Sequence, residues 1–293
     1  MIRRPRLLLL PDVRNWAFHT TANTIAEHCA DIFDIDIYFT HEKPTLHGPY
    51  DIIHVFYPFE THHRNFDIGN AKCITSVCSH RWEKEMDTYK FADKHLSQFD
   101  AVAVINIQLL SMLYDLHPHV FLCPDGINTK MFDRTDVRSG PMVVGWAGNT
   151  NDSIKQLPLL QKACEGICEL RIASGDLDVN AMVRFYNTID VIVCCSETEG
   201  GPRTLAEGMS CGNFPVSFNV GIAPEIIEHE TNGLLVEEKS IEGLRSALLW
   251  CQNNIASVRG HWRVNREYIR SQRDKCHTTK QMAHMYQHVL SST

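Results

Sequence analysis

The sequence predicts an α/β fold with two doubly wound parallel sheets. Three observations support this fold class. Apolar runs of strand length alternate with segments of helical periodicity in both halves of the chain, which implies βαβ units. A polar, non-periodic stretch at residues 133–140 separates the halves and predicts a linker. The length of 293 residues, of which 44% are hydrophobic, suits two domains of ordinary size.

The N-terminal half contains five apolar runs that predict strands. These runs lie at residues 6–10, 35–39, 51–56, 72–77 and 101–105. Helices are expected at residues 22–33, 82–96 and 109–116. The first run follows a basic start but stops at Pro11, well short of a secretory core, so we interpret it as a strand. We therefore expect residues 1–137 to form one Rossmann-like domain.

The C-terminal half repeats this alternation. Strands are expected at residues 143–146, 170–173, 191–195, 214–217 and 233–236. Helices are expected at residues 154–165, 180–187, 203–210, 224–229 and 241–253. These elements predict a second Rossmann-like domain over residues 138–255. Two further helical stretches, at 256–271 and 278–290, have no strand after them.

Charge and cysteine content narrow the functional classes. A formal net charge of -7 argues against a protein that binds nucleic acid. Eleven scattered cysteines fit the reduced thiols of the cytoplasm better than a disulfide framework. No stretch approaches the roughly twenty apolar residues of a membrane span. We expect a cytoplasmic protein that is soluble or at most peripherally associated with a membrane.

Residues 196–236 carry the most specific pattern in the chain. Glu199 and Glu207 are separated by seven residues across a Gly-Gly-Pro turn. The apolar run before them predicts a strand that is buried on both faces of a parallel sheet. Pro202 occupies a position that tolerates a missing N–H, so we expect the next helix to begin near Arg203.

The first turn of this helix predicts an anion site. Backbone N–H groups at Arg203, Thr204 and Leu205 would have no partner within the helix, and together with the helix dipole they favour a phosphate. Glu207 lies about one turn further on and can accept hydrogen bonds from a vicinal diol such as ribose. Glu199 would lie on the other side of the phosphate. Alternatively, Glu199 is a solvated loop residue and Glu207 an ordinary exposed helix residue.

The surrounding residues extend this pattern over about forty positions. The chain reads S-x-x-E-G-x-P-x-x-x-x-E-x-M-x-x-G-x-x-P-V, followed by G-x-x-P-E-I-I and N-G-L-L-V. This segment resembles the donor-binding half of the family 4 retaining glycosyltransferases (glycosyl transferases group 1), which have the GT-B fold. Residues 124–132 and 143–148 resemble the segment that enters that domain and its first strand and glycine turn. The resemblance implies two Rossmann-like domains facing each other across a cleft that holds the active site.

The resemblance also implies roles for individual residues. Glu199 would contact the hydroxyls of the donor sugar, Glu207 would bind the ribose, and Lys155 would stabilise the diphosphate charge. The donor-binding set that it implies comprises Gly148, Asn149, Gly200, Gly201, Pro202, Arg203, Thr204, Leu205 and Glu207. Asn149 occupies a place where the family has arginine or lysine, and Arg203 could supply a compensating cation. Alternatively, Lys155 is a solvated helix lysine.

The N-terminal domain is expected to bind the acceptor. His80 follows a strand at its carboxyl end, where crevice residues gather, and is our candidate for a catalytic, cleft-facing histidine; alternatively, it is a hydrogen-bonded loop residue. Trp16 and His19 could stack on a sugar or simply pack the domain core. The basic cluster at residues 61–64 could meet an anionic acceptor, yet such a run is usually a solvated loop. In the family, the last helices, here within 256–293, cross back to brace the first domain.

The activity that the resemblance implies is transfer of a sugar from a nucleotide diphosphate sugar to a hydroxyl of a glycan, lipid or small-molecule acceptor, with retained anomeric configuration. We expect no cofactor beyond this co-substrate. The D-x-D pair at 176–178 is expected in a loop without further metal ligands, and helix N–H groups and cations can neutralise the leaving diphosphate, so no essential metal ion is expected. Two alternatives are a catalytically degenerate nucleotide-sugar binding protein and another GT-B enzyme, such as a sugar-nucleotide epimerase.

Overall fold

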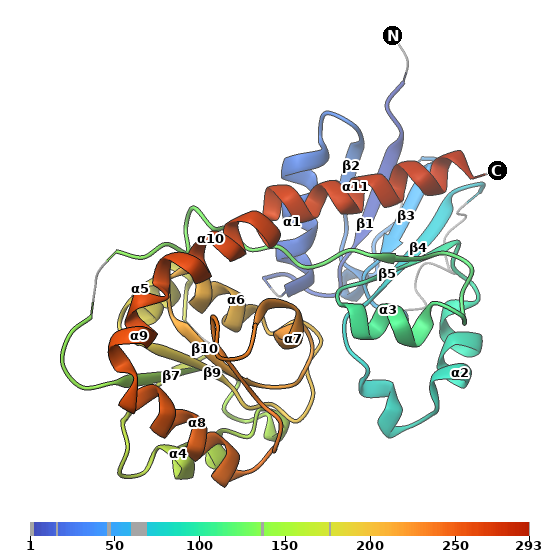
Figure 1. The fold of residues 1–293 in the computed structure, drawn as a ribbon. Coiled ribbons are helices and arrows are strands. Elements are labelled where there is room, and N and C mark those ends of the chain that lie inside the picture. Colours follow the sequence, from blue (N-terminus) through green and yellow to red (C-terminus); the bar gives the residue numbers. More distant parts are fainter. Residues whose placement is uncertain are drawn as a thin grey trace. The chain divides into compact units, whose positions relative to one another are not determined.

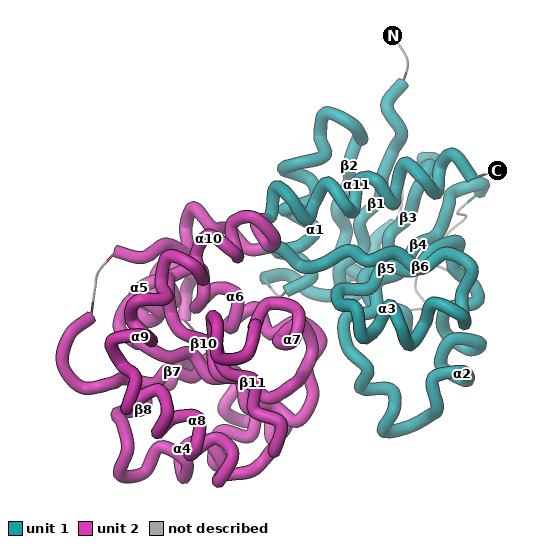
Figure 2. Tube along the Cα trace, in the orientation of Figure 1, with its two compact units in different colours: residues 1–126, 275–293 teal, residues 127–274 magenta. Residues whose placement is uncertain are grey.

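The protein comprises two compact units, each built on a parallel sheet. A computed structural model describes residues 3–15, 17–45, 48–59, 69–135, 138–175 and 177–292. Unit 1 consists of residues 1–126 and 275–293, and unit 2 of residues 127–274 (Figures 1 and 2). Trp16, the cluster at 61–64 and Asp176 lie outside the described residues. The predicted α/β class with two doubly wound sheets is confirmed.

Unit 1 is organised around a six-stranded sheet with the order β2-β1-β3-β4-β5-β6, in which each neighbouring pair is parallel. Its strands are β1 (Arg6–Leu10), β2 (Asp34–Ile37), β3 (Ile52–Val55), β4 (Lys72–Val77), β5 (Ala101–Val104) and β6 (Val120–Leu122). The first five match apolar runs of the sequence. The sixth was not expected, because it is an edge strand of three half-buried residues that is defined by its pairing with β5 rather than by a pattern of its own.

The helices of unit 1 include one long element from the end of the chain. They are α1 (Ala17–Cys29), α2 (Thr88–Phe91), α3 (Ile107–Leu113) and α11 (Lys275–Ser291), with a 3-10 helix at Thr40–Glu42. The expected helix at 82–96 is divided into a 3-10 helix (Arg81–Lys84), α2 and a π-helical turn (Ala92–Leu96). The division falls at Asp87, whose carboxylate accepts the N–H of Lys90 at 2.9 Å and caps a new helix. Helix α11 packs along α1 (Figure 1).

Unit 2 is organised around a five-stranded parallel sheet with the order β11-β10-β9-β7-β8. Its strands are β7 (Val143–Gly148), β8 (Glu169–Ser174), β9 (Val191–Cys194), β10 (Phe214–Phe218) and β11 (Leu234–Val236). Its helices are η5 (Ser153–Lys155, a 3-10 helix), α4 (Leu157–Cys164), α5 (Val179–Asn187), α6 (Arg203–Ser210), α7 (Ala223–Ile226), α8 (Ile241–Asn253), α9 (Ile255–Gly260) and α10 (Trp262–Gln272). The strand order reverses at β7, which lies between β8 and β9, so a topological switch point falls between the ends of β7 and β9.

Helix α6 packs directly on β9 because Gly208 has no side chain. A Cβ atom at Gly208 would lie 3.0 Å from the side chain of Ile192, which is tighter than most such contacts. Every residue of β9 is buried, as expected for a central strand that helices cover on both faces. The glycine weakens the helix by up to about 1 kcal/mol relative to alanine, and the close packing offsets this cost.

The chain passes between the units at Gly126–Ile127 and at Asp274–Lys275. The sequence placed the boundaries at 137/138 and 255/256, and packing explains the difference. Phe132 is buried in the core of unit 2, and its carbonyl accepts a hydrogen bond from Ser210 Oγ at 2.5 Å. Helix α10 packs against α6, and Asn265 Nδ2 donates to the carbonyl of Asn213 at 3.1 Å. Residues 127–135 and 256–274 therefore belong to unit 2, whereas α11 belongs to unit 1.

The described ranges contain neither a helix that could span a membrane nor a cluster of metal-ligating side chains. None of the helices there combines the length and the apolar character that crossing a bilayer requires. In the same ranges, no group of three or more His, Cys, Asp or Glu side chains is arranged to hold a metal ion. All eleven cysteines are free thiols.

Candidate functional site

The residues expected to bind the donor lie at the carboxyl edge of the sheet in unit 2. Gly148 is the last residue of β7, and Ser196 follows β9, so both lie beside the switch point. Ligands of open α/β sheets bind in the crevice at this place. A Cβ atom at Gly148 would lie 3.1 Å from the ring of Trp146, so a side chain here would crowd that ring.

Lys155 and Glu199 form an ion pair at this edge. The Lys155 ammonium donates a hydrogen bond to Glu199 Oε1, and Ser196 Oγ donates to the same oxygen at 2.8 Å. The two charged side chains are 24% and 11% exposed, so the pair is largely withdrawn from water. The N–H of Glu197 donates to the carbonyl of Ile154 at 2.9 Å, which ties η5 to the loop after β9. The structure thus brings together Glu199 and Lys155, which with His80 are the residues that we expect to take part in the reaction.

The backbone of the loop that carries Glu199 is packed against Gly221. This glycine follows β10 and has a φ of 55°, in the left-handed region that favours glycine. A Cβ atom here would lie 2.4 Å from the carbonyl oxygen of Gly200 and 3.1 Å from that of Glu199. The position of the loop therefore depends on the absence of a side chain at Gly221.

Glu207 lies in the second turn of α6 and is held by two polar neighbours. Its Oε2 accepts a hydrogen bond from the Tyr186 hydroxyl at 2.9 Å, and its Oε1 lies 3.9 Å from Nε of Arg203, one turn earlier. Burial raises the pKa of Glu207, while Arg203 and Tyr186 oppose the rise. Burial also raises the pKa of Tyr186, and the neighbouring Glu207 adds to that rise. The carboxylate is therefore fixed in one orientation, with the charged form partly compensated.

The first turn of α6 differs from the sequence expectation at Leu205. Its N–H donates to the carbonyl of Pro202 at 2.9 Å, because a 3-10-type bond tightens the start of the helix. Its side chain is wholly buried in the core of unit 2. We therefore correct the predicted phosphate-binding set by removing the amide of Leu205, and keep the amides of Arg203 and Thr204.

Asn149 follows β7 and shapes the turn that leads to Lys155. Its Oδ1 accepts the N–H of Asn151 at 3.0 Å, and its carbonyl accepts the N–H of Asp152 at 3.2 Å. Asp152 then caps η5, since its Oδ1 accepts the N–H of Ile154 at 3.1 Å. Asn149 thus supports the turn, and it supplies no cation at the place where the resemblance implies one.

The histidines suggested for the acceptor side belong to unit 1. His80 follows β4 and occupies the N-cap position of the 3-10 helix at Arg81–Lys84, so it lies beyond the carboxyl end of a strand in that sheet. His19 accepts the N–H of Asn15 through Nδ1 at 2.9 Å and packs edge-on against Phe39. These contacts favour the packing interpretation of His19, whereas the role of His80 stays a prediction.

Two contacts of the site were not expected from the sequence. Ser196 opens the motif that carries Glu199, and its position three residues before that carboxylate is a signal that could have assigned it as a hydrogen-bond donor. Tyr186 gives no comparable signal, because it lies on α5 and meets Glu207 only through the packing of the core of unit 2.

Comparisons with known proteins agree with this geometry. The family profile described as "Glycosyl transferases group 1" matches residues 165–257, a segment that contains Glu199 and Glu207. The structure is similar to sucrose-phosphate synthase from Thermosynechococcus elongatus, at a TM-score of 0.82 and 16% identity, covering 99% of this chain and 100% of that chain. It is also similar to Anabaena HepE in complex with UDP and glucose, at a TM-score of 0.80 and 12% identity, covering 97% of this chain and 100% of that chain. No curated protein matches the sequence.

A third similar structure is a glycosyltransferase from Rickettsia africae, at a TM-score of 0.77 and 14% identity, covering 99% of this chain and 100% of that chain. The fold is therefore that of the GT-B glycosyltransferases. Residues 165–257 of unit 2 match the glycosyl transferases group 1 profile, which confirms the group 1 part of the resemblance that the motifs predicted.

Proposed function

We propose that the protein is a retaining glycosyltransferase that moves a sugar from a nucleotide diphosphate sugar to a hydroxyl of a glycan, lipid or small-molecule acceptor. The observation that supports this most strongly is the placement of Glu199, Lys155 and Glu207 on the elements that follow β7 and β9 at the switch point. A sugar–diphosphate–ribose ligand needs a cationic phosphate site flanked by acceptors for the sugar and ribose hydroxyls. In this proposal unit 2 binds the donor and unit 1 the acceptor.

Glu207 is the proposed ribose ligand. Its carboxylate is oriented by Tyr186 and lies near Arg203, so it does not have to lose conformational freedom when a ligand binds. A carboxylate with a fixed orientation can accept two hydrogen bonds from a vicinal diol. Burial of this carboxylate costs free energy, as its raised pKa indicates, and a role in ligand binding accounts for that cost.

Lys155 and Glu199 are the proposed residues around the reacting bond. An ammonium has three N–H donors, so Lys155 can keep its bond to Glu199 and still donate to a diphosphate oxygen. Both neighbours of Glu199 bind Oε1, and among the described residues its Oε2 accepts no hydrogen bond, which suits that oxygen to a hydroxyl of the donor sugar. Arg203 and the amides of Arg203 and Thr204 would add positive charge around the phosphates.

The proposed transfer proceeds through an oxocarbenium-like transition state. The bond between the anomeric carbon and the phosphate oxygen breaks, and its electron pair leaves with the diphosphate. The acceptor oxygen attacks the anomeric carbon from the same face, and its proton passes to the leaving phosphate. Lys155 and Arg203 would stabilise the charge that develops on that phosphate. Because Glu199 is paired with Lys155, we assign it a positioning role and name no nucleophile.

Three further features complete the proposal. Fixed cations and helix amides would neutralise the diphosphate, so the reaction is proposed to need no metal ion. His80 is proposed to contact the acceptor or the sugar.

Free cysteines throughout the chain suit the reducing cytoplasm, where the protein would act in solution or at a membrane surface.

A second candidate function rests on Asn149. Because its side chain supports a turn and carries no charge, the diphosphate would be held by fewer cations than the resemblance implies. A diphosphate site with fewer cations favours the second candidate function, which is binding of nucleotide sugars without turnover. Release of free nucleotide only when an acceptor is present distinguishes a transferase from this alternative and from an epimerase.

The first experiment measures thermal stabilisation by UDP-, GDP- and ADP-sugars. A ligand that binds only the native state raises stability by mass action, by about 2.7 kcal/mol at one hundred times its dissociation constant. UDP-sugars are the first choice, because one similar structure is HepE in complex with UDP-glucose. We expect a selective shift for the wild type and none for Glu207→Ala.

The matched control is Glu267→Ala, which removes an exposed glutamate from helix α10 of the same unit. This variant should be stabilised like the wild type. Equal stabilisation of Glu207→Ala and Glu267→Ala would exclude the ribose assignment. Once a donor is known, the proton NMR signal of the product's anomeric centre tests retention, and unchanged turnover in EDTA tests metal independence.

A further inference from the structure

The turn between α4 and β8 brings two cysteines together. Helix α4 ends at Cys164, and Gly166, with a φ of 72°, reverses the chain. The N–H groups of Ile167 and Cys168 both donate to the carbonyl of Cys164, at 3.0 and 3.3 Å. A turn closed between residues i and i+4 holds its end Cα atoms about 6 Å apart, and disulfides span Cα separations of about 4.4–6.8 Å. The turn therefore suits a disulfide with little backbone movement.

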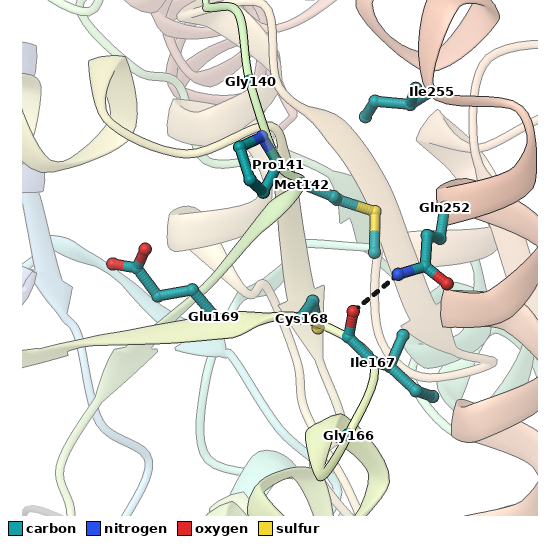
Figure 3. A pocket seen from close by; sticks show the side chains of 9 residues that line it. All are labelled: Gly140, Pro141, Met142, Gly166, Ile167, Cys168, Glu169, Gln252 and Ile255. Atoms are coloured by element: carbon teal, nitrogen blue, oxygen red, sulfur yellow. Dashed lines mark hydrogen bonds between the residues drawn. The ribbon is translucent and has the colours of Figure 1, made fainter.

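Cys168 is the accessible member of this pair. It lines a cavity of about 470 Å³, together with Met142, Glu169 and Gln252 (Figure 3). One wall of the cavity is fixed by a hydrogen bond from Gln252 Nε2 to the carbonyl of Ile167 at 2.7 Å. Cys168 is half-buried, whereas Cys164 is buried. Because Met142 precedes β7 and Glu169 begins β8, the cavity lies at the amino ends of these strands, away from the candidate donor site.

The proximity of the two thiols makes them chemically different. The neighbouring Cys164 thiol lowers the pKa of the Cys168 thiol. The neighbouring Cys168, followed by burial, raises the pKa of the Cys164 thiol. By contrast, burial raises the pKa of Cys78, the other half-buried cysteine of the chain. Since the thiolate is the reactive form of cysteine, Cys168 has the best combination of access and ionisation among the cysteines that are not fully exposed.

We propose that Cys164 and Cys168 form an oxidisable dithiol, in which Cys168 reacts with a peroxide through the cavity and Cys164 converts the product to a disulfide. The Cys168 thiolate attacks one peroxide oxygen, the O–O bond breaks, and the other oxygen leaves as hydroxide or alkoxide, so that the sulfur becomes a sulfenic acid. The Cys164 thiol then attacks this sulfur. The S–S bond forms, the S–O bond breaks, and water leaves with the proton of Cys164. The peroxide gains the two electrons that the sulfurs lose.

Alkylation kinetics test the reactivity of Cys168. Cys276 is the exposed cysteine, so the experiment uses the full chain with Cys276→Ser. Brief treatment with N-ethylmaleimide followed by trypsin should label Cys168, in the peptide 163–171, at least tenfold faster than any other cysteine. Cys78→Ser in the same background is the matched control and should leave this rate unchanged. Faster labelling of Cys78, or of any other cysteine, than of Cys168 would overturn the proposal.

Oxidation with hydrogen peroxide tests the disulfide. Both cysteines lie in the tryptic peptide 163–171, which should become lighter by two hydrogen atoms, resist alkylation and recover with dithiothreitol. This measurement needs no variant, so it does not depend on the folding of one. In Cys164→Ser, Cys168 should instead retain a sulfenic acid that dimedone traps. A peptide that remains reduced while other cysteines oxidise, or a disulfide from Cys168 to a different cysteine, would refute the pairing.

Discussion

Replacing Gly221 with alanine should displace Glu199 without removing any functional group. The new Cβ would lie 2.4 Å from the carbonyl oxygen of Gly200, whereas real Cβ contacts essentially never fall below 3.0 Å. Because that neighbour is backbone, the loop must withdraw by about 0.6 Å or more. A misplacement of about 1 Å at a reacting centre can lower a rate about a hundredfold. We therefore expect Gly221→Ala to lower the transfer rate by about tenfold and to weaken donor binding.

The same substitution carries a backbone cost that must be separated from the contact. At a φ of 55° an alanine costs about 1 kcal/mol or more relative to glycine. Gly140→Ala provides the matched control, because Gly140 also has a positive φ, 83°, but among the described residues beyond its two chain neighbours no atom lies within 4 Å of its added Cβ. Both variants should lose the backbone part of the stability, and Gly221→Ala should lose about 1–3 kcal/mol more from overpacking.

Three measurements decide this prediction. Urea unfolding gives the free energy of unfolding of each variant, and isothermal titration with the donor identified by thermal stabilisation gives its affinity. The rate is measured as release of nucleotide in the presence of acceptor. If folded Gly221→Ala matched Gly140→Ala in donor affinity and rate, the loop contact would not position Glu199, and the reasoning would be refuted.

Three further predictions concern buried ionisable groups. Glu207→Gln should be more stable than the wild type at pH 8 and equal to it near pH 4, because a raised carboxyl pKa makes the folded state lose stability as the pH rises above the pKa of the unfolded state. Thermal unfolding at both pH values checks this, and a less stable variant at pH 8 would contradict it. Asp190→Asn should lower the free energy of unfolding in urea by about 3–5 kcal/mol, since the carboxylate is 2% exposed and accepts hydrogen bonds from Arg138 and Arg259; a loss below about 1 kcal/mol would show a weak surface-type pair. Burial lowers the pKa of His54 from 6.5 to about 3, so the unfolded state accepts a proton that the folded state does not, and the free energy of unfolding should fall by up to about 1.4 kcal/mol per pH unit as the pH drops from 6.5 toward 3. His54→Gln should flatten this part of the curve of stability against pH, and an unchanged slope would mean that other groups cause it.

The parallel sheets could be predicted because their strands are covered on both faces. Such strands show continuous apolar runs, and Val191–Cys194 is buried at every position. The edge strand at Val120–Leu122 depends on pairing with β5, and a run of three half-buried residues contains little local information. Asp87 was a readable cap inside the expected helix at 82–96, but helical periodicity alone does not show where a helix is interrupted. The domain boundaries were harder, because residues 133–140 are polar although Phe132 beside them is core.

Some residues of the candidate site can be predicted from local sequence, whereas others depend on tertiary packing. Glu199 and Glu207 follow from spacing and turn chemistry along one segment, which is local. The ion pair from Glu199 to Lys155 joins residues 44 positions apart, and only the adjacency of β7 and β9 brings them together. Tyr186 depends on core packing, and the engagement of the Leu205 amide depends on how tightly the first turn of α6 closes. Sequence spacing therefore identifies the charged candidate residues and misses the groups that orient them.

The two chain crossings at the unit boundary lie side by side. Ile127 forms a β-bridge with Asp274, and its N–H donates to the carbonyl of Arg273 at 2.9 Å. A Cβ atom at Gly126 would lie only 2.6 Å from the Cα of Lys275. Unit 2 is thus an insertion with adjacent termini, and joining Gly126 to Lys275 through a short linker requires little backbone movement in unit 1. The segment 127–274 can therefore be exchanged as a cassette, and under the proposal that unit 2 binds the donor and unit 1 the acceptor, the two preferences become separately transplantable properties.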